Sequence, residues 1–287
     1  RGFIWVYGRR DRSALIESSK PNCPRRLIEM QLDATQWSTV YNILSFGLVS
    51  MLATTVYTLV SQNRVLPKYR NALVLSSMVT FIAAYHYLRI FDSFKDATTE
   101  GTFTVVTDFK ESSMAFNEGY RYVDWILTVP LLLVEVIAVL ALAKEAARSL
   151  ITRLVPASAA MIALGYPGEV SSDQGEKIMW GVLSTIPFLY ILYVLFVELG
   201  KSLDRQPEGV AATIGRLRLL LIATWGVYPI AYLLPIIDAD GAASSGAFVG
   251  RQVGYTIADV AAKCVFGLTI LKIARMKSIA EGMKDDH

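Results

Sequence analysis

Two residues near the C-terminus, Asp259 and Lys263, have types and a spacing that could do chemistry inside a membrane. They lie four residues apart in the apolar stretch from Tyr255 to Gly267, so on a helix they share one face, one turn apart. A charge at mid-membrane depth is costly, so an intramembrane lysine first indicates a functional site. The alternative is a buried ion pair that only fixes helix packing.

A second set of charged residues follows one stripe of an earlier apolar stretch. Arg121, Asp124, Thr128 and Glu135 are separated by 3, 4 and 7 residues, the spacing of one helical face. Glu135 lies 11 residues beyond Asp124, about 16 Å along a helix. Its sequence neighbours are leucine and valine, so it is a second, isolated acid.

This separation of two acids is what proton transport requires. A carboxyl group in apolar surroundings holds its proton more tightly, whereas a carboxylate beside a cation stays ionised and can accept one. Asp124 is therefore the predicted acceptor and Glu135 the predicted donor. The group between them must change its proton affinity, and Lys263 could do so as an imine with an aldehyde cofactor.

The composition places this chemistry in a membrane protein. The chain has 287 residues, 53% hydrophobic and 18% charged, and its mean hydropathy is +0.41. These values are too apolar for an ordinary soluble domain of this size. The two cysteines, Cys23 and Cys264, predict neither a disulfide framework nor a metal site. We expect no metal and no nucleic-acid partner.

Seven apolar stretches are long enough to cross a bilayer as helices, which predicts an all-α membrane protein, a bundle of seven transmembrane helices. The predicted spans are residues 37–61, 71–93, 117–143, 151–169, 177–200, 215–237 and 251–275. Between the second and third spans, Gly101 to Lys110 (GTFTVVTDFK) predicts a short strand or a short β-hairpin, of which we expect the hairpin.

The charges of the loops predict the orientation and the domain limits. The loops after spans one, three and five are rich in Lys and Arg, as cytoplasmic loops are, whereas the loop after span two is acidic. The N-terminus is therefore expected outside and the C-terminus in the cytoplasm, although the basic N-terminal segment opposes this rule. We expect a polar basic tail over 1–35, a transmembrane domain over 36–275 and a cytoplasmic tail over 276–287.

Three motifs together resemble a known family. RYVDW with Thr128, Pro130 and Glu135, WGVYPIAY in the sixth span, and DVAAK in the seventh closely resemble microbial rhodopsins, specifically the xanthorhodopsin-like proton pumps with an Asp, Thr, Glu triplet. The resemblance covers about residues 36–275. It implies a light-driven outward proton pump that is not an enzyme.

The resemblance also implies roles for individual residues. Lys263 would carry all-trans retinal as a protonated Schiff base. Asp124 would be the primary counterion and proton acceptor, and Asp259 the second counterion. Arg121 would be the gate towards the outside, and Glu135 the cytoplasmic proton donor.

Aromatic residues near this site predict a retinal pocket. Trp225, Tyr228 and Tyr232 recur at spacings of 3 and 4, and with Trp125 and Tyr255 they could enclose a flat polyene. Such a stripe alone is more often helix packing, but the neighbouring Asp and Lys favour a pocket.

Three further pocket positions come from the resemblance. Leu132 occupies the position where related proteins have Leu with green absorption and Gln with blue, so we expect green absorption. Gly165 is also expected to line the retinal site. Gly181 could be a window through which a hydroxylated carotenoid reaches retinal, or a small residue that serves helix packing.

Two other positions have specific expectations. His86 could be a packing residue, but the resemblance places it against the counterion carboxylate, where the two groups could share a proton. Arg251 stands where some archaeal pumps have a proton-release acid, which argues against early release from that position.

Three rival functions remain at this stage. A pump or channel for another ion would alter the triplet, a sensory photoreceptor commonly lacks the cytoplasmic carboxyl donor, and a G-protein-coupled receptor would carry motifs absent here. We expect the lipid bilayer as the main partner, a homo-oligomer, no obligate soluble partner and a place in the plasma membrane.

Overall fold

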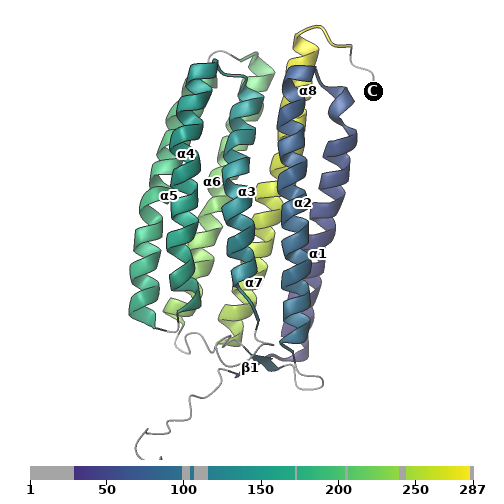
Figure 1. The fold of residues 1–287 in the computed structure, drawn as a ribbon. Helices are drawn as coiled ribbons and strands as arrows, with labels where there is room; N and C mark the ends of the chain where they lie inside the picture. Colours follow the sequence, from purple (N-terminus) through teal and green to yellow (C-terminus); the bar gives the residue numbers. More distant parts are fainter. Residues whose placement is uncertain are drawn as a thin grey trace, which may run out of the picture.

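Long helices side by side make up almost all of the structure (Figure 1). The computed structural model describes residues 29–98, 104–106, 116–171, 173–203, 206–238 and 244–284. The helices in this part are α1 Ala34–Val60, α2 Pro67–Asp96, α3 Gly119–Leu140, α4 Lys144–Val170, α5 Gln174–Leu203, α6 Glu208–Ile237, α7 Ser245–Asp259 and α8 Phe266–Ala280, with a short 3-10 turn, η1, at Gln62–Arg64.

The predicted bundle of seven membrane helices is confirmed. Six helices, α1 to α6, are each long and apolar enough to cross a membrane. The seventh span consists of α7, the π-helical segment η3 (Val260–Val265) and α8, which follow one another without a gap. A π turn takes more residues than an α turn and is frequent at functional sites. Lys263 lies within it.

Most helices extend beyond the predicted apolar stretches, because polar turns continue the helix outside the hydrocarbon core. α1 begins at Ala34 behind an N-cap, in which Asp33 and Gln36 bond each other's backbone N–H groups. α3 instead ends early, at Leu140, where Ala141 has a left-handed backbone with φ of 51°. The Lys277 ammonium donates to the carbonyls of Val139 and Leu140, both at 3.1 Å, and satisfies this helix end.

The strand or hairpin predicted over 101–110 contains one described strand, and this strand pairs outside the predicted segment. Strand β2, Thr104–Val106, lies in the predicted segment, but it pairs antiparallel with β1, Glu29–Gln31, which precedes the first helix. Strand pairing over such a sequence distance leaves no local turn signal. The other residues of that segment lie outside the described part.

The folded domain therefore begins before residue 36. Met30 and Leu32 are buried, with exposed fractions of 2% and 4%, and they pack in one apolar cluster with Phe94, Phe116 and Phe248. Met30 and Leu32 thus pack against the bundle, although they lie within the segment predicted as a tail. We call this end of the bundle the β-sheet end; the C-terminal end of α8 lies at the opposite end (Figure 1).

Candidate functional site

The predicted lysine and two aspartates meet at the centre of the bundle. Lys263 Nζ lies 2.7 Å from Asp124 Oδ2 and 2.8 Å from Asp259 Oδ1. All three residues are buried, with exposed fractions of 2% or less. One cation lies between two anions in an interior with little water, so the charge of each of these three side chains strongly affects the other two.

The two aspartates differ in their other partners. The oxygens of Asp259 accept further hydrogen bonds from Tyr87 at 2.8 Å, Trp125 at 3.1 Å and Tyr228 at 2.7 Å. Asp124 Oδ1 has no hydrogen-bond partner within the described part of the chain. Hydrogen bonds donated to a carboxylate favour its ionised form. Asp124 is therefore the acid of the pair that can take up a proton more readily.

Arg121 links this centre to the β-sheet end. Its side chain is 1% exposed, and Nη2 donates to Gln252 Oε1 at 2.7 Å. Its nitrogens lie 3.8 Å from Asp259 Oδ2 and 3.9 Å from Glu118 Oε2. The guanidinium thus stands between the central carboxylates and a second acidic group, as a gate would.

Thr128 lies one turn beyond Asp124 on α3. Its hydroxyl donates to the backbone carbonyl of Asp124 at 2.9 Å, and the residue is fully buried. The side chain therefore fixes the backbone next to Asp124, and in this structure its hydroxyl does not bond the Asp124 carboxylate.

Glu135 is isolated, as its apolar sequence neighbours predict. It is fully buried, and neither carboxyl oxygen has a hydrogen-bond partner among the described residues. Its helix neighbours Leu132, Leu133 and Val136 belong to the apolar core, and the Ser76 hydroxyl of α2 is the polar group beside it. An unpartnered carboxyl in such surroundings keeps its proton.

His86 lies close to the aspartate pair without bonding it. Its Nδ1 donates to the backbone carbonyl of Ile82 at 2.9 Å, and its ring meets the edge of Tyr85. It is near enough to Asp124 for an electrostatic interaction. The expected proton sharing between His86 and Asp124 stays a prediction.

A cavity of about 270 Å³ lies beside Lys263. Its lining includes all nine residues predicted to hold a cofactor: Trp125, Leu132, Gly165, Gly181, Trp225, Tyr228, Tyr232, Tyr255 and Lys263. Trp125 meets Tyr228 and Tyr255 edge to face, each at 5.1 Å between ring centres.

The lining fits a flat apolar aldehyde. It is aromatic and aliphatic over most of its surface, as small-molecule sites usually are, and Lys263 is the one primary amine among the lining residues that the structure describes. In this structure the free amine of Lys263 stands for the nitrogen that a covalently bound aldehyde would carry.

The two glycines of the cavity allow close contacts. A Cβ atom at Gly181 would lie 2.9 Å from Tyr232 Cε1, and one at Gly165 would lie 3.3 Å from both Ser184 Oγ and Tyr122 Cε1. Gly181 therefore makes room for the Tyr232 ring inside the bundle. This contact supports the packing role of Gly181. Its role as a window for a carotenoid stays a prediction.

Several site residues had not been predicted. Gln252 lies seven residues before Asp259, so the helical spacing could have identified it, and Tyr87 directly follows His86. Nothing in the sequence indicated that Glu169 belongs to a site, because an acidic residue at the end of an apolar stretch is usually an exposed residue at a helix end. In the structure its side chain is 1% exposed and pairs with Arg251.

The family follows from similarity to known proteins. Residues 39–276 match the family model described as "Bacteriorhodopsin-like protein". The green-light absorbing proteorhodopsin of Gamma-proteobacterium EBAC31A08 is 31% identical over 252 residues, which are 86% of this chain and 90% of that protein. Two solved structures are also similar over most of their length. Thermophilic rhodopsin is 42% identical with a TM-score of 0.81, over 88% of this chain and 99% of that chain.

The second structure is xanthorhodopsin, described as a light-driven ion pump with dual chromophore. It is 44% identical with a TM-score of 0.80, over 89% of this chain and 99% of that chain. This level of identity over nearly the whole bundle agrees with the motifs of the third, sixth and seventh spans. The chain is thus an integral membrane protein that belongs to the bacteriorhodopsin-like family, the microbial type 1 rhodopsins.

Proposed function

We propose that this protein is a light-driven outward proton pump that uses all-trans retinal bound to Lys263. The observation that supports this most is the arrangement of the carboxyl groups around that amine. Asp124 has one oxygen without a hydrogen bond, Asp259 is bonded on both oxygens, and Glu135 lies apart in the apolar core.

Retinal, when bound, would supply light absorption and, by forming an imine with the Lys263 amine, would make the proton affinity of that nitrogen depend on illumination. The remaining functions belong to the chain. The aromatic residues of the cavity hold the polyene and exclude water, Asp259 stays ionised opposite the cation, and Asp124 takes up the proton. Glu135 returns a proton from the C-terminal side.

The direction of transport follows from the orientation. Glu135 lies towards the C-terminal end of α3, and Arg121 lies towards the β-sheet end. The basic loops support a cytoplasmic location for the C-terminal end. Protons would therefore enter past Glu135 and leave past Arg121, outward across the plasma membrane.

The relatives support the class but do not distinguish the colour, because both a green-light and a blue-light absorbing proteorhodopsin are among them. The expected green absorption rests on Leu132, which lines the cavity. A pump for another ion or a sensory photoreceptor is the alternative. The presence of Asp124, Thr128 and Glu135 in one buried stripe favours the proton pump.

The test is the pH of an unbuffered suspension of cells that express the protein with all-trans retinal. Illumination should acidify the medium, and a protonophore should abolish the change. Acidification that persists with protonophore, or alkalinisation that the protonophore enhances, would indicate transport of another ion. A light-absorbing pigment without any pH change would favour a sensor.

A carotenoid antenna is a second proposal, for which the cavity gives a specific reason. Gly181, Val182 and Ile178 of α5 line the cavity, and Val182 and Ile178 are 60% and 50% exposed on the outside of the bundle. The cavity thus borders the apolar surface of α5 that would face lipid. Xanthorhodopsin, whose structure is described with a dual chromophore, is similar to this chain. A hydroxylated carotenoid on that surface would lie beside the retinal cavity.

A further inference from the structure

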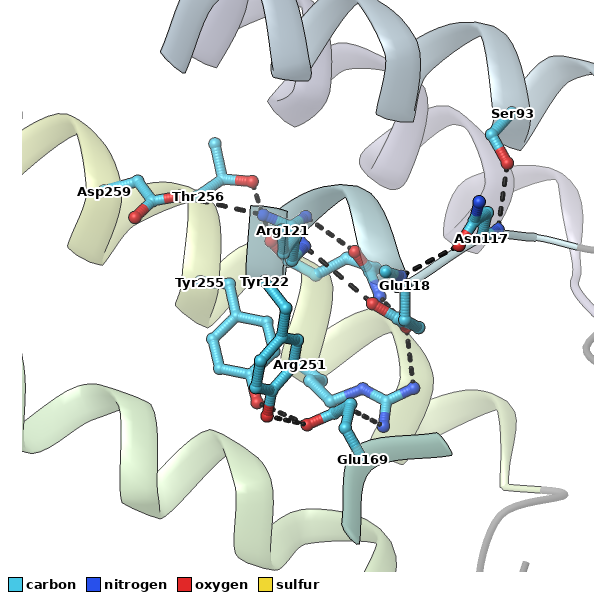
Figure 2. A network of polar contacts seen from close by, with 12 residues as sticks. Ser93, Asn117, Glu118, Arg121, Tyr122, Glu169, Arg251, Tyr255, Thr256 and Asp259 are labelled. Atoms are coloured by element: carbon cyan, nitrogen blue, oxygen red, sulfur yellow. Dashed lines mark hydrogen bonds and ion pairs between the residues drawn. The ribbon is translucent and has the colours of Figure 1, made fainter. Parts of the chain in front are cut away.

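A buried ion-pair cluster lies at the β-sheet end, between three helices (Figure 2). Arg251 of α7 donates through Nη1 to Glu169 Oε1 of α4 at 2.8 Å, and through Nη2 to Glu118 Oε1, just before α3, at 2.9 Å. Gln252 also donates to Glu118 Oε1 at 2.9 Å. One arginine therefore joins the ends of α3 and α4 to α7.

Glu169 contacts the cavity wall through its other oxygen. Tyr122 and Tyr255 both donate their hydroxyls to Glu169 Oε2, at 3.1 and 3.3 Å (Figure 2). Both tyrosines line the cavity beside Lys263. The Trp125 ring packs against each of them, and its Nε1 donates to Asp259. The carboxylate thus holds two side chains of the wall in place.

Both oxygens of Glu169 are engaged as acceptors. Its side chain is 1% exposed, and its two oxygens accept one charge-assisted bond and two hydroxyl bonds. A protonated carboxyl would use one oxygen as a donor, and the arginine and tyrosine hydroxyls would then compete for fewer acceptor positions. Lys177, the other cation nearby, donates to the backbone carbonyls of Gly168 and Glu169.

The same cluster reaches the central aspartates by a second route. Glu118 Oε2 lies 3.9 Å from Arg121, which lies 3.8 Å from Asp259. The charges alternate in sign along Glu169, Arg251, Glu118, Arg121 and Asp259, of which Arg251 and Glu118 are 13% and 14% exposed and the others are buried. Loss of one negative charge at Glu169 would leave the positive charge of Arg251 less compensated near the centre, where burial weakens screening.

We propose that Glu169 is a positioning residue of the retinal site, which orients Tyr122 and Tyr255 in the cavity wall and offsets the charge of Arg251. This inference rests on the proposed retinal function. Glu169 does not touch the reacting atoms. It acts through the two tyrosines and through the charge balance around Asp124 and Asp259.

The charged and titratable groups around both sites define the test. Asp124 and Asp259 face Lys263 of η3, Arg121 of α3, His86 and Tyr87 of α2, and Tyr228 of α6. Glu169 faces Arg251 and Tyr255 of α7, Tyr122 of α3, Lys177 of α5, Tyr232 of α6 and, through Arg251, Glu118.

The experiment compares two charge-neutralising variants of the full-length protein, each regenerated with all-trans retinal. The midpoint of the acid-induced colour change reports protonation of the central carboxylate. Glu169→Gln removes a negative charge, so the midpoint should fall. Arg251→Gln removes a positive charge, so it should rise. Each shift should be on the order of 1 pH unit, as for charges about 10 Å apart at low effective dielectric.

A matched control and a second pair of variants separate the effect of the charge of Glu169 from the effect of its hydrogen bonds to the tyrosines. Glu176→Gln, an exposed carboxylate of α5 at the same end, should leave the midpoint unchanged. Tyr255→Phe should shift the visible band in the parent protein but shift it less in the Glu169→Gln background, because the two residues act through one hydrogen bond.

Opposite shifts for the two charge variants would support the inference, because a purely structural defect has no reason to change sign with the charge removed. Shifts of the midpoint in the same direction, or no shift, would overturn the inference. The proposed function would still stand in that case, because the parent protein forms a visible pigment. A parent protein that forms no visible pigment would instead contradict the proposed function.

If Glu169→Gln forms no pigment, Glu169→Asp keeps the charge and shortens the reach to the tyrosines. We then expect a shifted band with a midpoint close to that of the parent. A shifted midpoint with an unshifted band would overturn the inference.

Discussion

Asp124 and Glu135 lie on the same face of α3, yet only Asp124 has an ion-pair partner. The two residues are 11 positions apart, which returns the helix to almost the same direction after about three turns. Asp124 lies 2.7 Å from Lys263, whereas both oxygens of Glu135 lack a hydrogen bond within the described structure. One helix therefore presents two acids to the same interior, one in an ion pair and one in apolar surroundings.

Removal of the amine should abolish the pigment. We expect Lys263→Ala to fold, because Asp259 keeps Arg121 and three hydrogen-bond donors, but to show no visible band after addition of retinal. Lys272→Ala, an exposed lysine of α8, is the control and should keep the band. A Lys263→Ala protein with a visible pigment reducible by borohydride would contradict the assignment of Lys263.

Neutralisation of Glu135 should slow proton return without a change in colour. Glu135→Gln lies about 16 Å along α3 from Asp124, so the absorption band should stay nearly unchanged. Loss of a positioned proton donor should slow the return of the proton to the Lys263 nitrogen by roughly 100-fold. Flash photolysis at neutral pH measures this rate, and Glu145→Gln, at an exposed position of α4, is the control. An unchanged rate would remove Glu135 from the donor role.

Protonation or replacement of Asp124 should shift the absorption to the red. Acid titration removes the negative charge opposite the cation, which favours spread of positive charge along the polyene. Asp124→Asn should show the red-shifted band already at neutral pH and should not pump protons. Normal pumping by this variant would place the acceptor elsewhere.

His86 should tune this titration if it interacts with Asp124. We expect His86→Ala to move the midpoint of the acid colour change, because the imidazole lies within electrostatic range of the carboxylate. An unmoved midpoint would support the packing role that its bond to the Ile82 carbonyl indicates.

A bulky side chain at position 181 should separate antenna function from pumping. Gly181→Trp would block a carotenoid on the outer surface of α5, and the Tyr232 ring would have to shift, because a Cβ atom at position 181 would already lie 2.9 Å from Tyr232 Cε1. The absorption band and the light-driven acidification of the variant, measured without carotenoid, show how much of the retinal function remains after that shift. The measurement is the excitation spectrum of retinal fluorescence after incubation with lutein or zeaxanthin. Gly226→Trp, where the added side chain meets open space, is the control. A parent protein without carotenoid bands would restrict Gly181 to its packing role.

The contact between Glu281 and α2 should make a small, pH-dependent contribution to stability. Glu281 accepts hydrogen bonds from Lys68 and Tyr69, and these lower the pKa of its carboxyl group. A lowered pKa in the folded state stabilises the protein above the unfolded pKa of about 4.3, and this stabilisation is lost as the pH falls through the folded value.

Because Lys68 and Glu281 are 54% and 37% exposed, the effect of Glu281→Gln should be about 1 kcal/mol or less at pH 6. Thermal unfolding of both proteins between pH 3 and 7 measures it. The difference between them should disappear at the acid end of this range. A difference that grows as the pH falls would contradict the sign of this contribution.

The sequence identified the central site residues because they are charged residues inside apolar stretches that are long enough to cross a membrane. Charges inside apolar stretches are rare, so Asp124, Glu135, Asp259 and Lys263 were identifiable from their neighbours alone. Hydropathy located the apolar core of each helix but not its end, because helices continue through polar turns. The last carbonyls of α3 accept hydrogen bonds from Lys277, which is more than a hundred residues away in the sequence.

Contacts between distant segments account for what was missed. The β1 and β2 pairing has no local turn, and η3 differs from an α-helix only in its backbone hydrogen bonds. Glu169 lies at a helix end, and only the packing of α3, α4 and α7 shows that its carboxylate is buried. These features depend on which helices meet, which spacing within one helix cannot show.

The pairing of β1 with β2 has a consequence for the order of folding. β1 is synthesised before α1, and its partner β2 is synthesised only after α2 is complete. Both strands lie at one end of the bundle, so they can pair only after the chain has crossed the bilayer and returned. This small sheet therefore forms late relative to its first strand, after closure of a long loop. Its formation would mark the correct insertion of the first two helices.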